Sequence, residues 1–147
     1  MNKVLDKVSR IARLLAQEEQ PALLSTIGID GSPRSRYMGA FRIKEEGEIF
    51  LISPSKANKM QEIRRNSLAQ VILASKDCQR VLTLSGKAAI VEDMALRRSL
   101  FEETKPLRIY PVFDDNFGVI HFVSLRAEYL DLKICNSPYV FKIPRES

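Results

Sequence analysis

The segment ALLSTIGIDGSPRSRYMGAFRI, residues 22–43, sets the fold class of this chain. Its first eight residues, 22–29, are rich in aliphatic and β-branched side chains, which favour extended strands. Asp30-Gly31 follows, a dipeptide favoured in tight hairpin turns, and a second extended stretch runs from Arg34 to Ile43. We therefore expect two antiparallel strands joined by a turn.

Further strands are predicted along the rest of the chain, most of them following one another without a helix between them. A glycine inside one of them, Gly86, indicates a bulge or bend of the kind that barrels need. This order argues against a parallel doubly wound sheet and favours an antiparallel barrel or sandwich with helices at its ends. The predicted segments are Glu48–Ser53, Leu68–Ser75, Val81–Val91, Gly118–Lys133 and Tyr139–Ile143.

Three helices are predicted around these strands. Aliphatic residues recur at helical spacing in the first fifteen positions, which predicts an amphipathic helix that ends before Pro21. Ser55 is the expected cap of a helix over 56–65, and Asp93 the expected cap of a helix reaching about Glu103. A loop rich in proline and acidic residues, 104–116, follows the third helix.

The 147 residues fit one domain, 1–147, better than two. The formal net charge is +5, and most of the excess lies in residues 30–80, which hold ten basic and six acidic side chains. Such a concentration indicates an anionic partner, either a phosphorylated cofactor or a nucleic acid.

Several classes of protein are excluded by what the chain lacks. Its two cysteines, Cys78 and Cys135, are isolated, and His121 is the only histidine, so neither a disulfide framework nor a zinc site can be assembled; we expect two reduced thiols and no metal. The longest apolar runs are about four residues, against roughly 20 for a membrane helix, and no secretory signal is visible. We expect a cytoplasmic protein without a membrane partner.

One cluster of residues could hold a phosphate group. Arg34 and Arg36 are two apart on a predicted strand and project from the same face, which on pattern alone is more often a solvated face than a site. The strand that ends at Ser53 leads into a helix start, where free amides favour anions. The side chains there supply a hydroxyl, an amide and two ammonium groups: Ser55, Asn58, Lys56 and Lys59.

Four blocks of the sequence resemble a known family. The first three, in order, are DGSPRSRYM (30–38), EIFLISPSKANKMQEIRRNS (48–67) and LSGKAAIVED (84–93). They are similar to successive blocks of the FMN-binding split-barrel proteins, the superfamily of pyridoxamine-phosphate oxidase and the general stress proteins. The late segment FDDNFGVIHFVSLRAEYLD (113–131) is similar to the end of the general-stress-protein branch.

The resemblance implies a mainly β fold: a six-stranded antiparallel Greek-key split β-barrel of the FMN-binding type, with peripheral α-helices. It also implies a homodimer that holds FMN at the subunit interface, and a flavin-dependent oxidoreductase. Arg36 matches the family arginine that grips the FMN phosphate, and Lys59 matches its lysine partner. Met38 and Gly39 match the strand whose backbone runs along the isoalloxazine, and Ser53 matches a hydroxyl-bearing position.

The sequence also departs from the family pattern. Ala57 and Asn58 stand where relatives often carry a hydroxyl residue and an arginine, although Ser55 and Lys56 could compensate. Val81 replaces the ring-contacting glutamine of pyridoxamine-phosphate oxidases, and Leu130 replaces a tryptophan of the stress proteins. The chain has no tryptophan at all, so we do not expect a genuine pyridoxamine 5'-phosphate oxidase.

Other functions remain open at this stage. The chain could be a flavin-binding store, sensor or stress protein without catalysis, or the same scaffold could hold deazaflavin or haem, although only His121 could serve as a histidine ligand for haem. Nucleic-acid binding has the least support, because few aromatic residues accompany the basic segments. The sequence identifies neither a catalytic residue nor the electron donor or substrate, and His121 is the sole side chain with a near-neutral reference pKa.

Overall fold

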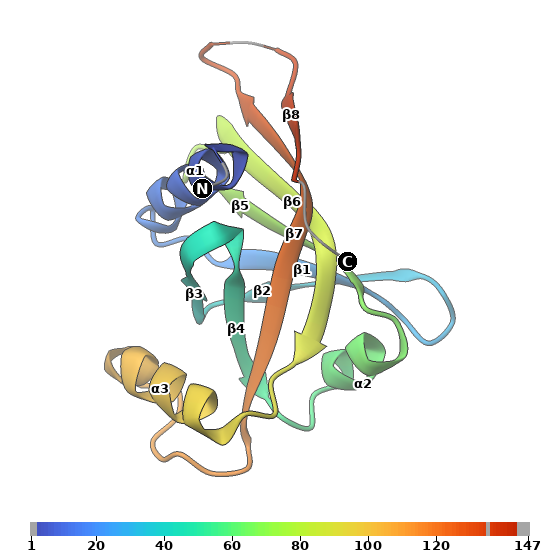
Figure 1. The fold of residues 1–147 in the computed structure, drawn as a ribbon, viewed down its shortest axis with the longest axis vertical. Coiled ribbons are helices and arrows are strands. Elements are labelled where there is room, and N and C mark those ends of the chain that lie inside the picture. Colours follow the sequence, from blue (N-terminus) through green and yellow to red (C-terminus); the bar gives the residue numbers. More distant parts are fainter. Residues whose placement is uncertain (1–2, 135, 144–147) are drawn as a thin grey trace.

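The computed structural model describes residues 3–134 and 136–143, and in them eight strands form one curled antiparallel sheet (Figure 1). The strands follow the order β2-β1-β5-β6-β7-β4-β3, and β8 pairs with β7 outside this path. Their bounds are β1 Ala22–Ile27, β2 Pro33–Met38, β3 Phe41–Ile43, β4 Ile49–Pro54, β5 Leu68–Ala74, β6 Arg80–Ile90, β7 Phe117–Asp131 and β8 Tyr139–Lys142. This curled sheet with outlying helices confirms the expected fold class.

The sheet has more strands than the six implied by the resemblance, partly because the expected strand 34–43 is divided. β2 ends at Met38 and pairs with β1, whereas β3 begins at Phe41 and pairs with β4. β2 and β3 are thus the two edge strands of the sheet, and only Gly39 and Ala40 join them. So short a connection is possible because the sheet curls and brings its two edges together. The periodicity of the sequence could not show this break, because both halves are extended.

The predicted hairpin is present between β1 and β2, with a longer connection than a two-residue turn. β1 stops at Ile27, and a loop of residues 28–32 closes when the Gly28 amide donates to the Ser32 carbonyl at 2.7 Å. Asp30 accepts hydrogen bonds from the amide and the hydroxyl of Ser32, and these bonds lower the pKa of its carboxyl group. Gly31 has a φ of 84°, a conformation that glycine adopts without strain.

Three α-helices and two short 3-10 helices lie around the sheet. The α-helices are α1 Lys3–Ala16, α2 Asn58–Arg65 and α3 Met94–Thr104, and the 3-10 turns are η1 Glu45–Gly47 and η2 Lys105–Leu107. Asp93 caps α3 as predicted, since its carboxylate accepts from the Leu96 amide at 3.0 Å. None of the described helices is long and apolar enough to cross a membrane.

The prediction that Ser55 caps α2 is wrong. The helix begins at Asn58, and its N-cap is Ala57, which has no side chain that could accept a hydrogen bond. The Ala57 amide instead donates to the Pro54 carbonyl at 3.1 Å, so that Ser55 and Lys56 lie in a turn between β4 and the helix. The first turn of α2 therefore starts without a side-chain cap.

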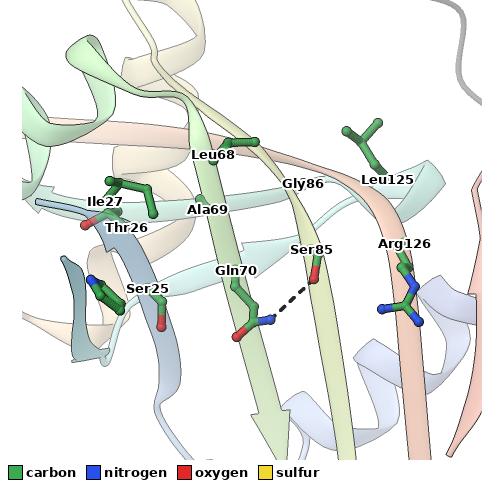
Figure 2. A pocket seen from close by; sticks show the side chains of 11 residues that line it. Ser25, Thr26, Ile27, Leu68, Ala69, Gln70, Ser85, Gly86, Leu125 and Arg126 are labelled. Atoms are coloured by element: carbon green, nitrogen blue, oxygen red, sulfur yellow. Dashed lines mark hydrogen bonds between the residues drawn. The ribbon is translucent and has the colours of Figure 1, made fainter. Parts of the chain in front are cut away.

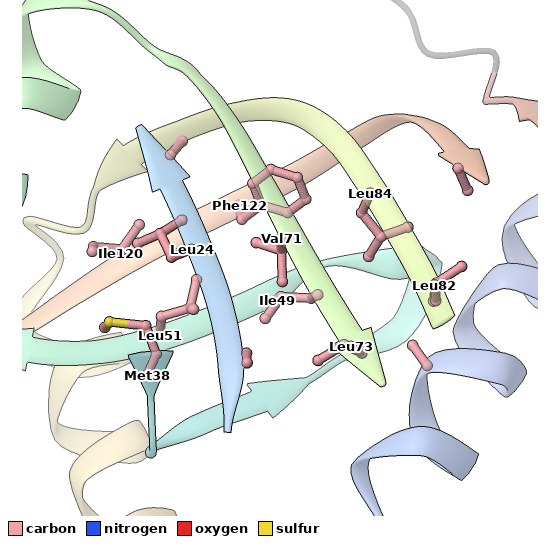
Figure 3. Packing of buried hydrophobic residues seen from close by; sticks show 14 of the residues in the cluster. Leu24, Met38, Ile49, Leu51, Val71, Leu73, Leu82, Leu84, Ile120 and Phe122 are labelled. Atoms are coloured by element: carbon pink, nitrogen blue, oxygen red, sulfur yellow. The ribbon is translucent and has the colours of Figure 1, made fainter. Parts of the chain in front are cut away.

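The hydrophobic core fills the inside of the curled sheet (Figure 3). Leu24, Ile49, Val71, Leu84 and Phe122 come from five different strands and are fully buried. The apolar face of α1 closes one opening of this core, and a second cluster under α3 is built around Leu100, Phe101 and Phe117.

Gly86 marks an irregularity in the longest strand pairing, as the sequence indicates. The β6–β7 register shifts between Ser85 and Gly86, and a Cβ at Gly86 would stand 1.9 Å from the carbonyl oxygen of Val123. Only glycine permits this approach. Of the two cysteines, Cys78 is a free, exposed thiol in the β5–β6 connection, and Cys135 lies outside the described residues.

Candidate functional site

Two arginines of β2 lie beside a carboxylate of α2. Leu24 pairs with Arg36 and Thr26 with Arg34 across the β1–β2 hairpin, so both arginines share the face of the buried Leu24 and Thr26. Glu62 comes from α2, which packs against β1. The Arg36 Nη2 donates to Glu62 Oε1 at 2.8 Å, and Arg34 Nε lies 3.9 Å from Glu62 Oε2.

Thr26 completes this arrangement. Its hydroxyl donates to Glu62 Oε1 at 2.9 Å and accepts from Arg36 Nη1 at 2.8 Å. Thr26 and Glu62 are both buried, at 1% and 5% exposure, whereas the Arg36 side chain is 22% exposed. Both NH2 groups of the Arg36 guanidinium are therefore held by the protein, while part of the side chain still meets solvent.

Lys59 adds a third cation next to these groups. Its ammonium donates to the hydroxyl of Ser53 at 2.9 Å, and Ser53 is buried at the end of β4. Burial lowers the pKa of Lys59, the positive charge of Arg36 lowers it further, and the negative charge of Glu62 opposes both effects. Arg36 and Lys59 are thus close enough to repel each other, which is typical of a site that receives an anion.

The residues predicted for a cofactor site come together only in part. Arg36, Ser53 and Lys59 are joined in this cluster. Asn58 lines an adjoining open hollow of about 360 Å³ together with Arg34, Gln61 and Glu62. We use the name cation cluster for this hollow together with the side chains of Thr26, Arg34, Arg36, Ser53, Lys59 and Glu62.

The other predicted site residues lie elsewhere. Ser55 and Lys56 line a separate hollow with the acidic loop residues Asp114 and Asp115. Gly39 is exposed and lines a third hollow, of about 670 Å³, against the segment that joins α1 to β1. The side chain of Met38 is buried in the core, so only its backbone is placed to border a ligand.

The sequence interpretation missed Glu62 and Thr26. A signal existed for Thr26, because it follows Ala22 and Leu24 on the buried face of an alternating strand, where a polar side chain needs a partner. Glu62 lies next to the inward-facing Met60 and Ile63 on a short helix, but a surface glutamate gives the same pattern. Only the packing of α2 on β1 shows that its carboxylate is buried.

A fourth hollow, of about 420 Å³, opens on the outer face of the sheet (Figure 2). Ser25, Gln70, Ser85 and Arg126 stand in register across β1, β5, β6 and β7, and Gln70 donates to Ser85 at 3.3 Å. Leu68 and Leu125 also line this hollow, with 53% and 40% of their surface exposed. We call these six residues the outer patch.

The single histidine is engaged on the β4–β7 pair. His121 Nε2 forms a hydrogen bond with the carboxylate of Glu48, and its ring stacks on Phe50 with centroids 4.6 Å apart. His121, Glu48 and Phe50 all lie outside the cation cluster. No group of three or more potential metal ligands occurs in the part of the chain that the structure describes.

A known protein family matches this chain over most of its length. The chain belongs to the family described as pyridoxamine 5'-phosphate oxidase like, whose model matches residues 6–143. No curated protein matches the chain.

Solved structures share the fold over most of the chain. A protein related to general stress protein 26 from Clostridium acetobutylicum is 20% identical with a TM-score of 0.72, over 94% of this chain and 96% of that one. The general stress protein 26 of Bacillus anthracis is 22% identical with a TM-score of 0.70, covering 91% and 97%. A heme binding protein from Mycobacterium smegmatis is 16% identical with a TM-score of 0.71, covering 92% of this chain and 57% of that one. At these identities the likeness shows the fold alone.

Proposed function

We propose that this protein binds FMN and holds the phosphate group at the cation cluster. The observation that carries the proposal is an excess of positive charge: Arg34, Arg36 and Lys59 lie beside the buried carboxylate of Glu62. Asp30 adds a second carboxylate, which lines the adjoining hollow beside Arg34. These five groups together have a formal charge of +1, an excess that favours a phosphate monoester, which carries about −1.5 to −2 at pH 7. The donor set therefore fits the phosphate end of FMN.

Each group in the cluster has a distinct role in this proposal. Arg36 offers the planar fork that grips phosphate oxygens, while Lys59 acts as a compact charge oriented by the hydroxyl of Ser53. The first turn of α2 adds backbone N–H groups without a competing side-chain cap. Bound FMN would supply the redox chemistry, and the protein would supply binding and electrostatics.

A second copy of this chain is the proposed neighbour of the flavin. The outer patch exposes Leu68 and Leu125 beside a polar row, on the same side of it (Figure 2), a combination suited to burial against a protein surface. Replacing Leu125 by Asp places a charge in that surface and should convert a dimer into a monomer, as measured by light scattering. An unchanged mass would place the dimer interface elsewhere.

Titration with two flavins tests the cofactor assignment. FMN and riboflavin differ only in the phosphate, so Arg36→Ala should weaken FMN by roughly tenfold or more and leave riboflavin nearly unchanged. Arg80→Ala is the matched control, because it removes an arginine from another pair, Arg80–Glu18. If Arg36→Ala loses the same affinity for both flavins, the phosphate lies elsewhere. If the wild-type protein binds neither flavin, the proposal is overturned.

We further propose a flavin-dependent oxidoreductase, with a flavin store or sensor as the alternative. Reduction of the FMN-loaded protein by NADH or NADPH, followed at the flavin absorbance band, separates the two. Rapid reduction supports the enzyme, and failure with both donors favours the store. Haem has less support from the residues, because its one candidate histidine ligand, His121, is already paired with Glu48 and stacked on Phe50.

A further inference from the structure

A buried carboxylate occupies the centre of the cation cluster. Glu62 accepts from Thr26 and Arg36 through one oxygen, at 2.9 and 2.8 Å, and its other oxygen lies 3.9 Å from Arg34. Only 5% of the side chain is exposed, so water screens its charge poorly. Any anion that reaches Arg36 therefore approaches a second anion that belongs to the protein.

Arg36 is bound to Glu62 and still has N–H donors for a further ligand. Its hydrogen bonds run to the Leu24 carbonyl at 3.4 Å, the Thr26 hydroxyl at 2.8 Å and Glu62 at 2.8 Å. A guanidinium carries five N–H donors, so these three bonds do not exhaust it. A phosphate can share Arg36, but it does so against the repulsion of Glu62.

We propose that Glu62 is a resident counter-anion that sets the phosphate affinity of the cluster. It holds Arg36 in position before a ligand arrives, and it weakens the binding of a phosphate group, so that the ligand exchanges readily. This inference rests on the proposed function to the extent that the phosphate is that of FMN. The buried position of Glu62, which the sequence did not show, carries it.

Removing the charge of Glu62 tests the proposal. Glu62→Gln keeps the size of the side chain and an oxygen that accepts from Thr26 and Arg36. We expect the Kd for FMN to fall by roughly tenfold, because a like charge has been removed, and the Kd for riboflavin to stay the same. The control Glu18→Gln removes one acid from the Arg80–Glu18 pair and should change neither value. FMN binding that is no tighter in Glu62→Gln than in the wild type would overturn the inference.

A second ligand separates this inference from the flavin assignment. Inorganic phosphate should raise the melting temperature of Glu62→Gln more than that of the wild type. If neither protein binds FMN but phosphate gives this difference, the proposed function fails and the role of Glu62 stands. If phosphate stabilises both proteins equally, or neither, the role of Glu62 is refuted whatever FMN does.

The wild-type protein provides a measurement that does not depend on the folding of a variant. If Glu62 repels the phosphate group, FMN should bind only about tenfold more tightly than riboflavin. Without that repulsion, two charge-assisted hydrogen bonds to the phosphate would make FMN bind roughly a thousandfold more tightly than riboflavin. A ratio of that size in the wild type would show that Glu62 does not weaken phosphate binding.

Discussion

Gly118 in β7 lies directly opposite Ser53 in β4, so close that a Cβ at Gly118 would stand 2.6 Å from the Ser53 carbonyl oxygen. The same Cβ would stand 2.9 Å from the Ser55 Cα and 2.5 Å from the Met60 side chain. Glycine thus allows β4 and the start of α2 to approach β7. This close contact places Ser53, and through it Lys59, in the cation cluster.

Gly118→Ala should therefore destabilise the protein by about 2–3 kcal/mol, because backbone atoms must move to admit the methyl group. FMN affinity should also fall, since the junction that orients Lys59 is displaced. Gly39→Ala is the control, because a Cβ there meets no atom within 4 Å. Urea denaturation of the two variants measures the difference, and equal stability would contradict the close packing.

Arg36→Ala should cost about 3 kcal/mol of stability, because it leaves the buried carboxylate of Glu62 without its nearest cation. The double variant Arg36→Ala/Glu62→Gln should lose less than the sum of the two single variants, since no buried charge then remains unpaired. A double-mutant cycle from urea denaturation gives the coupling. Additive losses would show that the pair contributes little.

Lys59 should make FMN binding depend on pH in the alkaline range. Its pKa lies below the ordinary 10.5, first because of burial and then because of Arg36, so its ammonium loses the proton earlier than a free lysine does. FMN affinity relative to riboflavin should therefore fall as the pH rises toward 10.5. Lys59→Arg keeps its charge there and should abolish this dependence in flavin titrations.

The stability of the ligand-free protein should change in the opposite direction over the same window. Between the lowered pKa and 10.5 the unfolded chain keeps a proton at Lys59 that the folded chain has lost. Stability then rises with pH through this group, by linkage. Wild type and Lys59→Arg should diverge accordingly in urea denaturation at alkaline pH, and parallel pH profiles would contradict the lowered pKa.

Asp93→Ala should cost about 1 kcal/mol, because the Leu96 amide loses its hydrogen-bond acceptor at the start of α3. Asp93→Asn retains an acceptor oxygen and should cost less. Thermal unfolding of the two variants provides the comparison. A loss as large for Asn as for Ala would show that the charge at the helix start, and not the cap, is the stabilising element.

Much of the fold could be predicted from the sequence because its signals are local. Alternating strands, the turn residues around Gly31 and the cap at Asp93 each depend on a few neighbouring positions. The division of residues 34–43 between β2 and β3 could not be predicted, because the sheet assigns the two halves to different partner strands.

The candidate site follows the same division between local and tertiary information. The sequence by itself determined an excess of basic residues around Arg36 and Lys59, because charge and spacing are properties of the chain. Only the tertiary structure decided that Glu62 and Thr26 join them, since they come from α2 and β1, far apart in sequence. Burial of a carboxylate depends on which helix face packs against which strand, and that choice is made by the whole core.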